Sequence, residues 1–275
     1  MFQPVIPLTG NSGWKFLEAT YDRQLKSYTD SPQVRNDRDY LVEKFSRPVA
    51  VEDLMKDSRL LRVSLTAFGL EGEEWKRGFI DKVLTEVADP ESTFLSRLNN
   101  PSYTAFAKAM TPVDGMITLT PAAISDMATQ FEAASFEAAV GEVDDNMRIS
   151  LNFKSEIGNI AGSSSSESAK IYRMLANVPV RTLLEGAMNL PEDIRKLPIE
   201  RQAEIFKERL QSTFGISDIS DLGSPQIVDK AIQRFHVMQS IREGASNYSP
   251  ASAALTILGN GLGSQSSENL FLSLL

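Results

Sequence analysis

Apolar residues recur at intervals of three and four along most of this sequence. Trp14, Leu17, Tyr21 and Leu25 form the first such series. This spacing places side chains on one face of an α-helix, and that face must be covered by other elements. Comparable series follow along the chain, separated by Pro and Gly residues that begin or end helices. The sequence therefore predicts an all-α, multihelical fold.

One segment fits two kinds of secondary structure. Between Met147 and Lys154 apolar and polar residues alternate, as in a strand, yet Ile149, Phe153 and Ile157 also step by four. Because a single strand would have no partner elsewhere in the chain, we predict a helix.

A weak internal repeat relates two parts of the chain. The tetrapeptide at 67–70, AFGL, matches AMNL at 187–190, so that Gly69 corresponds to Asn189. Gly and Asn are the residues that most readily adopt the left-handed conformation just past a helix end. We therefore predict two weakly related helical halves, with a helix ending at each of these residues.

The residues around Gly69 have predicted roles. Phe68 is expected in the core, and Glu73 and Glu74 are expected near the start of the next helix, where negative charge is favourable. These assignments give the segment from Phe68 to Glu74 a structural role.

The domain prediction follows from the same patterns. Residues 12–243 are predicted to form one all-α domain, with halves at about 12–118 and 119–243. Residues 244–275 form a Gly/Ser/Ala-rich tail with an apolar end. We expect that end to dock on the protein's own helices or on a partner, and an ordinary frayed terminus is the alternative.

Charge and composition exclude several classes of function. The 28 basic and 36 acidic residues give a net charge of −8, which argues against a nucleic-acid partner. The chain has no cysteine and one histidine, His236, so zinc sites built from Cys and His are excluded. We predict no metal and no cofactor.

Hydrophobicity along the chain bears on location. No apolar run reaches the roughly 18 to 20 residues that span a bilayer, and the N-terminus lacks the pattern of a secretory signal. A cytoplasmic location is expected, with signal-independent export left open.

Two pairs of residues could carry chemistry. His236 lies four residues before Ser240, but a nucleophilic pair also needs an acid and an oxyanion hole. We predict a partly exposed structural histidine. Asp57 and Arg59 could bind an anion or a partner, but we favour Asp57 as a helix N-cap with Arg59 reaching a nearby carboxylate or helix end.

The remaining candidates have simpler interpretations. Glu142, Asp144 and Asp145 lack the ligand spacing of a calcium loop, so a solvated turn is predicted. The glycine-rich stretch 259–263 lacks the context of a phosphate loop and is assigned to the tail. Trp14 and Trp75 are predicted to be core anchors.

A mixed cluster of charges is interpreted as a solvated helix face. Its basic members are Arg195, Lys196, Arg201, Lys207 and Arg209. No residue is assigned as catalytic, cofactor-binding or metal-binding.

Several longer motifs resemble one known family. SPQVRNDRDYLVEKF, VEDLMKDSRLLRVSLTAFGLE, FIDKVL, RLNNPSYTAFAKAM and LLEGAMNLPED occur in this order, and DLMKDSRLLRVSLTAFGL is the most specific block. The chain resembles an alphaproteobacterial family of unknown function whose members are often encoded in flagellar gene clusters. It departs from the family pattern at Ser163–Ser166 and in the segment MRISLNFKSE. The resemblance implies an all-helical fold and a flagellar association, and it supplies no catalytic residues.

Two functions from different classes fit this sequence. The first is a non-enzymatic structural or interaction protein serving flagellar assembly or the basal body, with other proteins as partners and self-association open. The alternative is a cytoplasmic small-ligand-binding protein or enzyme on a helical scaffold, which would need a pocket with converging polar groups.

Overall fold

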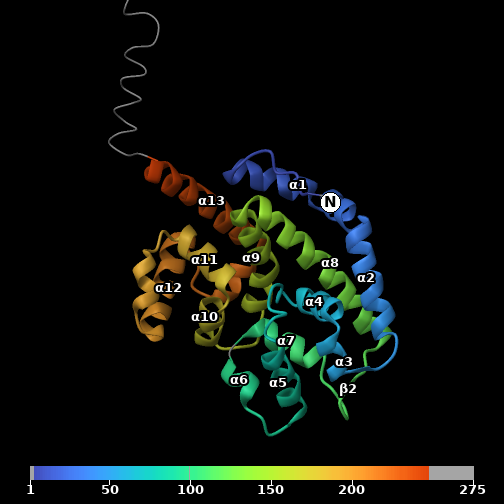
Figure 1. The fold of residues 1–275 in the computed structure, drawn as a ribbon. Coiled ribbons are helices and arrows are strands. Elements are labelled where there is room, and N and C mark those ends of the chain that lie inside the picture. The colour runs from blue at the N-terminus through green and yellow to red at the C-terminus, as the bar shows by residue number, and fades with distance from the viewer. Residues whose placement is uncertain (1–2, 99, 248–275) are drawn as a thin grey trace, which may run out of the picture.

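The computed structural model describes residues 3–98 and 100–247, and within these ranges the protein is predominantly helical (Figure 1). The earlier helices are α1 (Gly10–Thr29), α2 (Pro32–Phe45), α3 (Val51–Lys56), α4 (Ser58–Ala67), α5 (Arg77–Ala88), α6 (Phe94–Leu98) and α7 (Pro101–Ala109). The later helices are α8 (Pro121–Val143), α9 (Asp145–Ala161), α10 (Glu167–Ala176), α11 (Val178–Ala187), α12 (Ile199–Phe214) and α13 (Pro225–Asn247), with two short 3-10 helices, η1 (Glu192–Lys196) and η2 (Ile219–Gly223).

Two short strands complete the described fold. β1 (Val49–Ala50) pairs antiparallel with β2 (Met116–Ile117), with Val49 opposite Ile117. The predicted all-α class is confirmed. The segment from Met147 to Lys154 lies inside α9, so the preference for a helix there is also confirmed.

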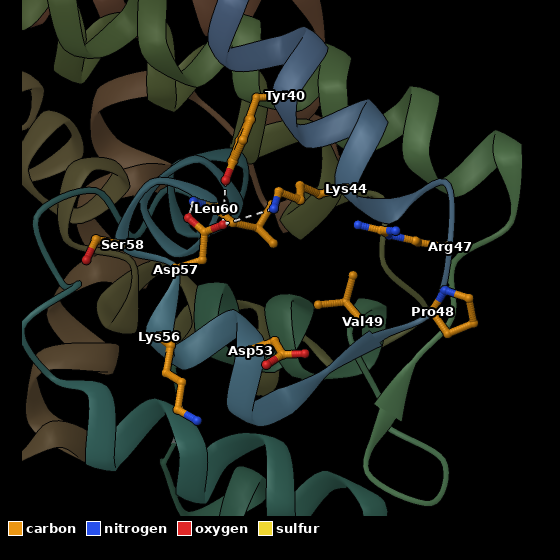
Figure 2. A pocket seen from close by; sticks show the side chains of 10 residues that line it. All are labelled: Tyr40, Lys44, Arg47, Pro48, Val49, Asp53, Lys56, Asp57, Ser58 and Leu60. Atoms are coloured by element: carbon orange, nitrogen blue, oxygen red, sulfur yellow. Dashed lines mark hydrogen bonds and ion pairs between the residues drawn. The ribbon is translucent and has the colours of Figure 1, made fainter.

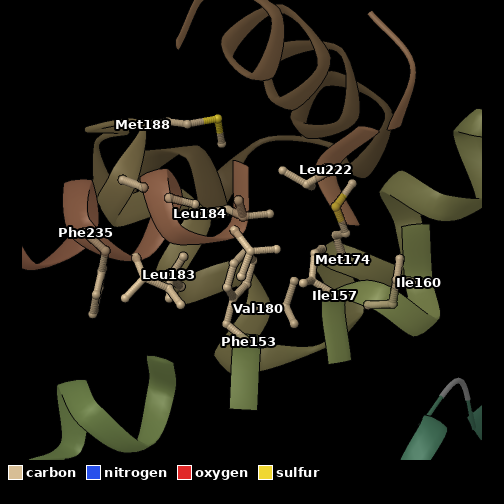
Figure 3. Close-up of a cluster of buried hydrophobic side chains, with 14 of the residues drawn as sticks. Phe153, Ile157, Ile160, Met174, Val180, Leu183, Leu184, Met188, Leu222 and Phe235 are labelled. Atoms are coloured by element: carbon tan, nitrogen blue, oxygen red, sulfur yellow. The ribbon is translucent and has the colours of Figure 1, made fainter. Parts of the chain in front are cut away.

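The buried apolar side chains form two clusters. The first cluster includes Trp14, Leu17, Phe136, Val140, Phe153, Ile157, Met174, Leu183, Leu184, Leu222 and Phe235. Figure 3 shows part of it, where side chains from α9, α10, α11 and α13 converge. The second cluster includes Leu41, Phe45, Leu54, Leu61, Val63, Ile80, Leu84, Phe106, Ile117, Met127 and Phe131.

One helix contributes to both clusters. The first turns of α8 place Met127 and Phe131 in the second cluster, and its later turns place Phe136 and Val140 in the first. Helix α1, although N-terminal, packs in the cluster formed mainly by residues after 136. The two buried clusters therefore do not divide at residue 118, and the division of the one domain into two halves stays a prediction.

The internal repeat is visible in the hydrogen bonds. Helices α4 and α11 have ten residues each, and their bounds differ by 120 at both ends. Each helix begins with an N-cap residue whose side chain accepts a hydrogen bond from the backbone N–H three residues later. Asp57 accepts from Leu60 in α4, and Asn177 accepts from Val180 in α11. Each ends at a residue with positive φ, 68° at Gly69 and 52° at Asn189.

The bonds that close these two helices match one to one. Gly69 N–H donates to Thr66 O and Leu70 N–H to Leu65 O, each over 3.0 Å. At the end of α11, Asn189 N–H donates to Gly186 O over 3.0 Å and Leu190 N–H donates to Glu185 O over 2.9 Å. Each of these four residues lies 120 positions after its counterpart at the end of α4. Both ends are Schellman motifs, in which the left-handed residue lets the chain reverse and satisfy the last carbonyls. The predicted helix ends at Gly69 and Asn189 are confirmed.

Two other local expectations are refined by the structure. Phe68 is half-buried at the edge of the second cluster, where its ring contacts Phe106 edge-on with centroids 5.7 Å apart. Helix α5 begins at Arg77 and has no acidic residue in its first turn, so the role expected for Glu73 and Glu74 at a helix N-terminus is wrong.

The C-terminal helix continues past the predicted end of the domain. α13 extends to Asn247, beyond Gly244, where the sequence predicted the tail to begin. The helix continues because Gly244 and the small residues after it do not by themselves stop a helix. The docking predicted for the apolar end of the tail concerns residues outside those the structure describes.

Candidate functional site

A cleft lies where α2 ends and α3 and α4 begin. It encloses about 660 Å³ and is lined by Tyr40, Lys44, Arg47, Pro48, Val49, Asp53, Lys56, Asp57, Ser58 and Leu60. Figure 2 shows Lys44 and Arg47 on one side of the space and Asp53 and Lys56 on the other. The lining side chains come from α2, α3, the start of α4, β1 and the turns between these elements.

Local sequence explains how these elements meet. Pro48 follows the last turn of α2, and a proline there prevents the helix from continuing. The chain then forms β1, where Val49 is buried against Ile117 of β2. A new helix start at Asp57 then brings the first turn of α4 back beside Tyr40 of α2.

Asp57 accepts three hydrogen bonds. Its Oδ1 accepts the backbone N–H groups of Arg59 and Leu60 at 3.1 and 2.9 Å, and its Oδ2 accepts the Tyr40 hydroxyl at 2.5 Å. Partial burial acts to raise the pKa of Asp57, but the bond from Tyr40 and those from the backbone outweigh it and lower that pKa overall. Asp57 is therefore an ionised N-cap, as the sequence predicted.

Arg59 reaches a different carboxylate from the one beside it in sequence. Its Nε donates to Asp37 of α2 at 2.7 Å, and Arg62 donates to the other oxygen of Asp37 at 2.6 Å. The Arg59 guanidinium also lies over the Tyr40 ring, 4.3 Å from its centroid. The interpretation of Asp57 as a cap with Arg59 reaching a nearby carboxylate is confirmed, and these contacts hold α4 against α2.

Trp75 occupies a different environment from the one predicted. Its side chain is 77% exposed in the loop between α4 and α5, so its assignment as a core anchor is wrong. The helical spacing from Trp75 to Phe79 is present in the sequence, but α5 starts only at Arg77. Trp14, in contrast, is 2% exposed and confirmed as a core residue.

The loop that carries Trp75 is braced on both sides. Glu73 accepts the Tyr103 hydroxyl at 3.0 Å and forms an ion pair with Lys76, whose ammonium lies 5.2 Å from the Trp75 ring centroid. After the tryptophan, Arg77 donates to Ser58 Oγ at 2.7 Å. Because Ser58 lines the cleft, this bond joins the Trp75 loop to the rim of the cleft.

His236 lies inside the first cluster. It is 1% exposed, so the prediction of a partly exposed histidine is wrong about exposure. Its Nε2 lies 3.0 Å from Ser150 Oγ, and its ring stacks on Trp14 with centroids 6.1 Å apart. Ser240 donates to the backbone carbonyl of His236, so it forms no pair with the ring. Burial lowers the pKa of His236 to about 4, which keeps the ring neutral near pH 7.

The other charged candidates have structural roles. Asp144 is the N-cap of α9, accepting the N–H groups of Asn146 and Met147 at 2.9 and 3.4 Å. Arg195, assigned from sequence to a solvated face, donates from Nη2 to the buried Glu185 at 2.6 Å. The glycine-rich stretch 259–263 lies outside the described residues.

The part of the chain that the structure describes holds neither a cluster of metal ligands nor a helix that could cross a membrane. Residues 3–98 and 100–247 contain no group of three or more His, Cys, Asp or Glu side chains arranged to hold a metal ion. Of the helices within the same ranges, none is both long enough and apolar enough to cross a membrane.

Sequence reasoning missed most of the cleft. The sequence patterns described above give no role to Tyr40, Lys44 or Arg47. The available signal was the sequence EKFSRP at 43–48, in which two cations and a proline end a helix. Their meeting with Asp57 depends on the turn through β1, which the sequence pattern did not predict.

Comparisons with known proteins place the chain in a family. A protein from Agrobacterium tumefaciens with a known X-ray crystal structure has a similar fold, with a TM-score of 0.67 and 22% sequence identity over 87% of this chain and 99% of that one. None of the curated proteins matches the sequence. Residues 67–228, more than half of the chain, match the sequence profile of a family described as a protein of unknown function, DUF1217. The chain is therefore a member of the DUF1217 family.

Proposed function

We propose that this protein is a non-enzymatic interaction protein that serves flagellar assembly or the basal body. The flagellar setting rests on the resemblance of its sequence motifs to proteins encoded in flagellar gene clusters. The interaction role rests on one structural observation, the exposed Trp75 in a braced loop.

Trp75 has the properties of an anchor for a partner protein. Tryptophan is among the residues that contribute most to binding energy at protein interfaces. Burying its exposed part against a partner would contribute on the order of 4 kcal/mol before the costs of association. The contacts of Glu73 and Arg77 already order the loop, so little conformational entropy remains to be lost on binding.

The enclosed position of the one histidine supports a non-enzymatic role. Ser150 and His236 form the pair that would be considered for nucleophilic catalysis, and both are buried among apolar side chains of the first cluster. A substrate would have to displace Trp14 or other core residues to reach them.

Complementation of a deletion strain tests this proposal. We expect deletion to reduce the swimming zone of the host bacterium in soft agar, and the wild-type gene to restore it. Trp75→Ala should fail to restore swimming at equal protein level, whereas Val113→Ala should restore it. Val113 is 71% exposed and is the matched control for loss of an exposed apolar side chain.

Two results would contradict the proposal separately. Normal swimming and normal flagella after deletion would refute the flagellar role. Full restoration by Trp75→Ala would show that the exposed tryptophan is not the contact on which the interaction depends.

A further inference from the structure

Three cationic side chains, Lys44, Arg47 and Lys56, line the cleft between α2 and the starts of α3 and α4. Lys44 Nζ forms an ion pair with Asp57 Oδ2 at 3.7 Å and lies 5.1 Å from the centroid of the Tyr40 ring. Because this ion pair is longer than a hydrogen bond, the three N–H donors of Lys44 can also contact a carboxylate of a ligand.

Arg47 is the second available cation. It is exposed at the end of α2 and forms no hydrogen bond or ion pair with any residue that the structure describes. Lys56, on the opposite side of the cleft, pairs with Glu52 at 2.6 Å. Asp53 also lines the cleft, and its carboxylate opposes negative charge in the same space.

We propose that this cleft binds an acidic peptide segment of the partner protein, with Lys44 and Arg47 as the groups that contact its carboxylates. The proposal deepens the interaction function proposed above and rests on it. The net charge of −8 on the whole chain opposes an acidic ligand at long range, so binding would depend on the short-range contacts of Lys44 and Arg47.

The arrangement of the cleft favours a peptide over a small inorganic anion. The cations come from α2, the turn after it and α3, and in Figure 2 they surround an open space instead of converging on one point. Pro48 is exposed at the edge of the same space and offers an apolar contact that a phosphate ion cannot use.

A hydrogen bond links the edge of the cleft to the loop that carries Trp75. Arg77 joins the Trp75 loop to Ser58, which lines the cleft, through a hydrogen bond of 2.7 Å. A segment bound at both places would place an apolar residue on Trp75 and carboxylates in the cleft.

Titration of the full chain with a defined probe tests the proposal. Acetylated tetraglutamate would be added to 15N-labelled protein and the backbone amide shifts followed, with acetylated tetraglutamine as the uncharged control. We expect shifts at residues lining the cleft with tetraglutamate only, and weaker binding when sodium chloride rises from about 0.02 to 0.2 M, because salt screens exposed charges.

Charge variants of opposite expected sign make the test specific. Lys44→Met and Arg47→Gln should each weaken tetraglutamate binding by about two- to fivefold, the range for exposed ion pairs, and Asp53→Asn should tighten it by about twofold. Arg173→Gln, an exposed change on α10 that leaves the cleft untouched, should have no effect.

The outcomes separate this proposal from the function on which it rests. Equal binding of tetraglutamine, indifference to Arg47→Gln, or no tightening by Asp53→Asn would overturn the assignment of the cleft. So would inorganic phosphate that binds the same residues as strongly as tetraglutamate. If Trp75→Ala still fails to restore swimming in that case, the interaction function stands and only the cleft assignment falls.

Discussion

Replacing Gly186 with alanine tests how closely α11 and α13 pack. A Cβ atom at Gly186 would lie 2.6 Å from Cδ2 and 2.9 Å from Cε2 of Phe235, which is completely buried. Helix propensity alone predicts that alanine stabilises α11 by about 1 kcal/mol. Overpacking a closed core costs about 1–3 kcal/mol, so the net expectation is a protein destabilised by up to about 2 kcal/mol.

Gly158→Ala is the matched control. Gly158 lies inside α9, and a Cβ there would have no atom within 4 Å. Gly158→Ala should therefore be stabilised by the higher helix propensity of alanine without any clash. The melting temperatures of Gly158→Ala and Gly186→Ala should differ by several degrees, since 1 kcal/mol corresponds to about 2–4 °C for a chain of this size. Thermal unfolding followed by circular dichroism measures both. If Gly186→Ala stabilises as much as Gly158→Ala, the close contact between α11 and Phe235 is refuted.

Three further predictions concern single side chains. Gly69→Ala should cost about 1–2 kcal/mol because of its positive φ, whereas Asn189→Gly should change stability by less than about 0.5 kcal/mol; denaturant titration compares them. Asp57→Ala should cost about 1 kcal/mol through loss of the N-cap, and a variant as stable as wild type would refute that role. Because burial lowers the pKa of His236 to about 4, the unfolded chain binds the extra proton, and this group removes about 2 kcal/mol of stability between pH 7 and 5. Burial raises the pKa of Glu137 to about 7, and this shift changes stability with pH in the opposite direction. The measurement is therefore the difference in unfolding free energy between wild type and His236→Gln at each pH. Parallel stability profiles for the two proteins would contradict the prediction for His236.

The fold class could be predicted because helices leave a local signature. Spacing of three and four, together with Pro and Gly at the boundaries, is set by residues close in sequence. The same holds for the helix ends at Gly69 and Asn189, where one residue with a special backbone preference determines the turn. The helical spacing gave a wrong prediction for Trp75, because an apolar residue spaced in register with the residues of a helix can lie outside that helix.

The cleft and the buried histidine could not be predicted for a different reason. Tyr40 meets Asp57, and Ser150 meets His236 across 86 positions, only because helices far apart in sequence pack together. A local pattern contains no information on such a pairing. The Asp57 cap was predictable because the N–H groups that it accepts belong to Arg59 and Leu60, within three residues of Asp57.

The sharing of α8 between the two cores has a consequence for how the protein opens. Phe131 and Phe136 lie on the same helix but in different clusters. If either cluster came apart, the other would lose part of its wall and expose apolar side chains to water. The two clusters should therefore unfold together, and the amide hydrogens in the middle of α8 should be among the last in the protein to exchange with solvent.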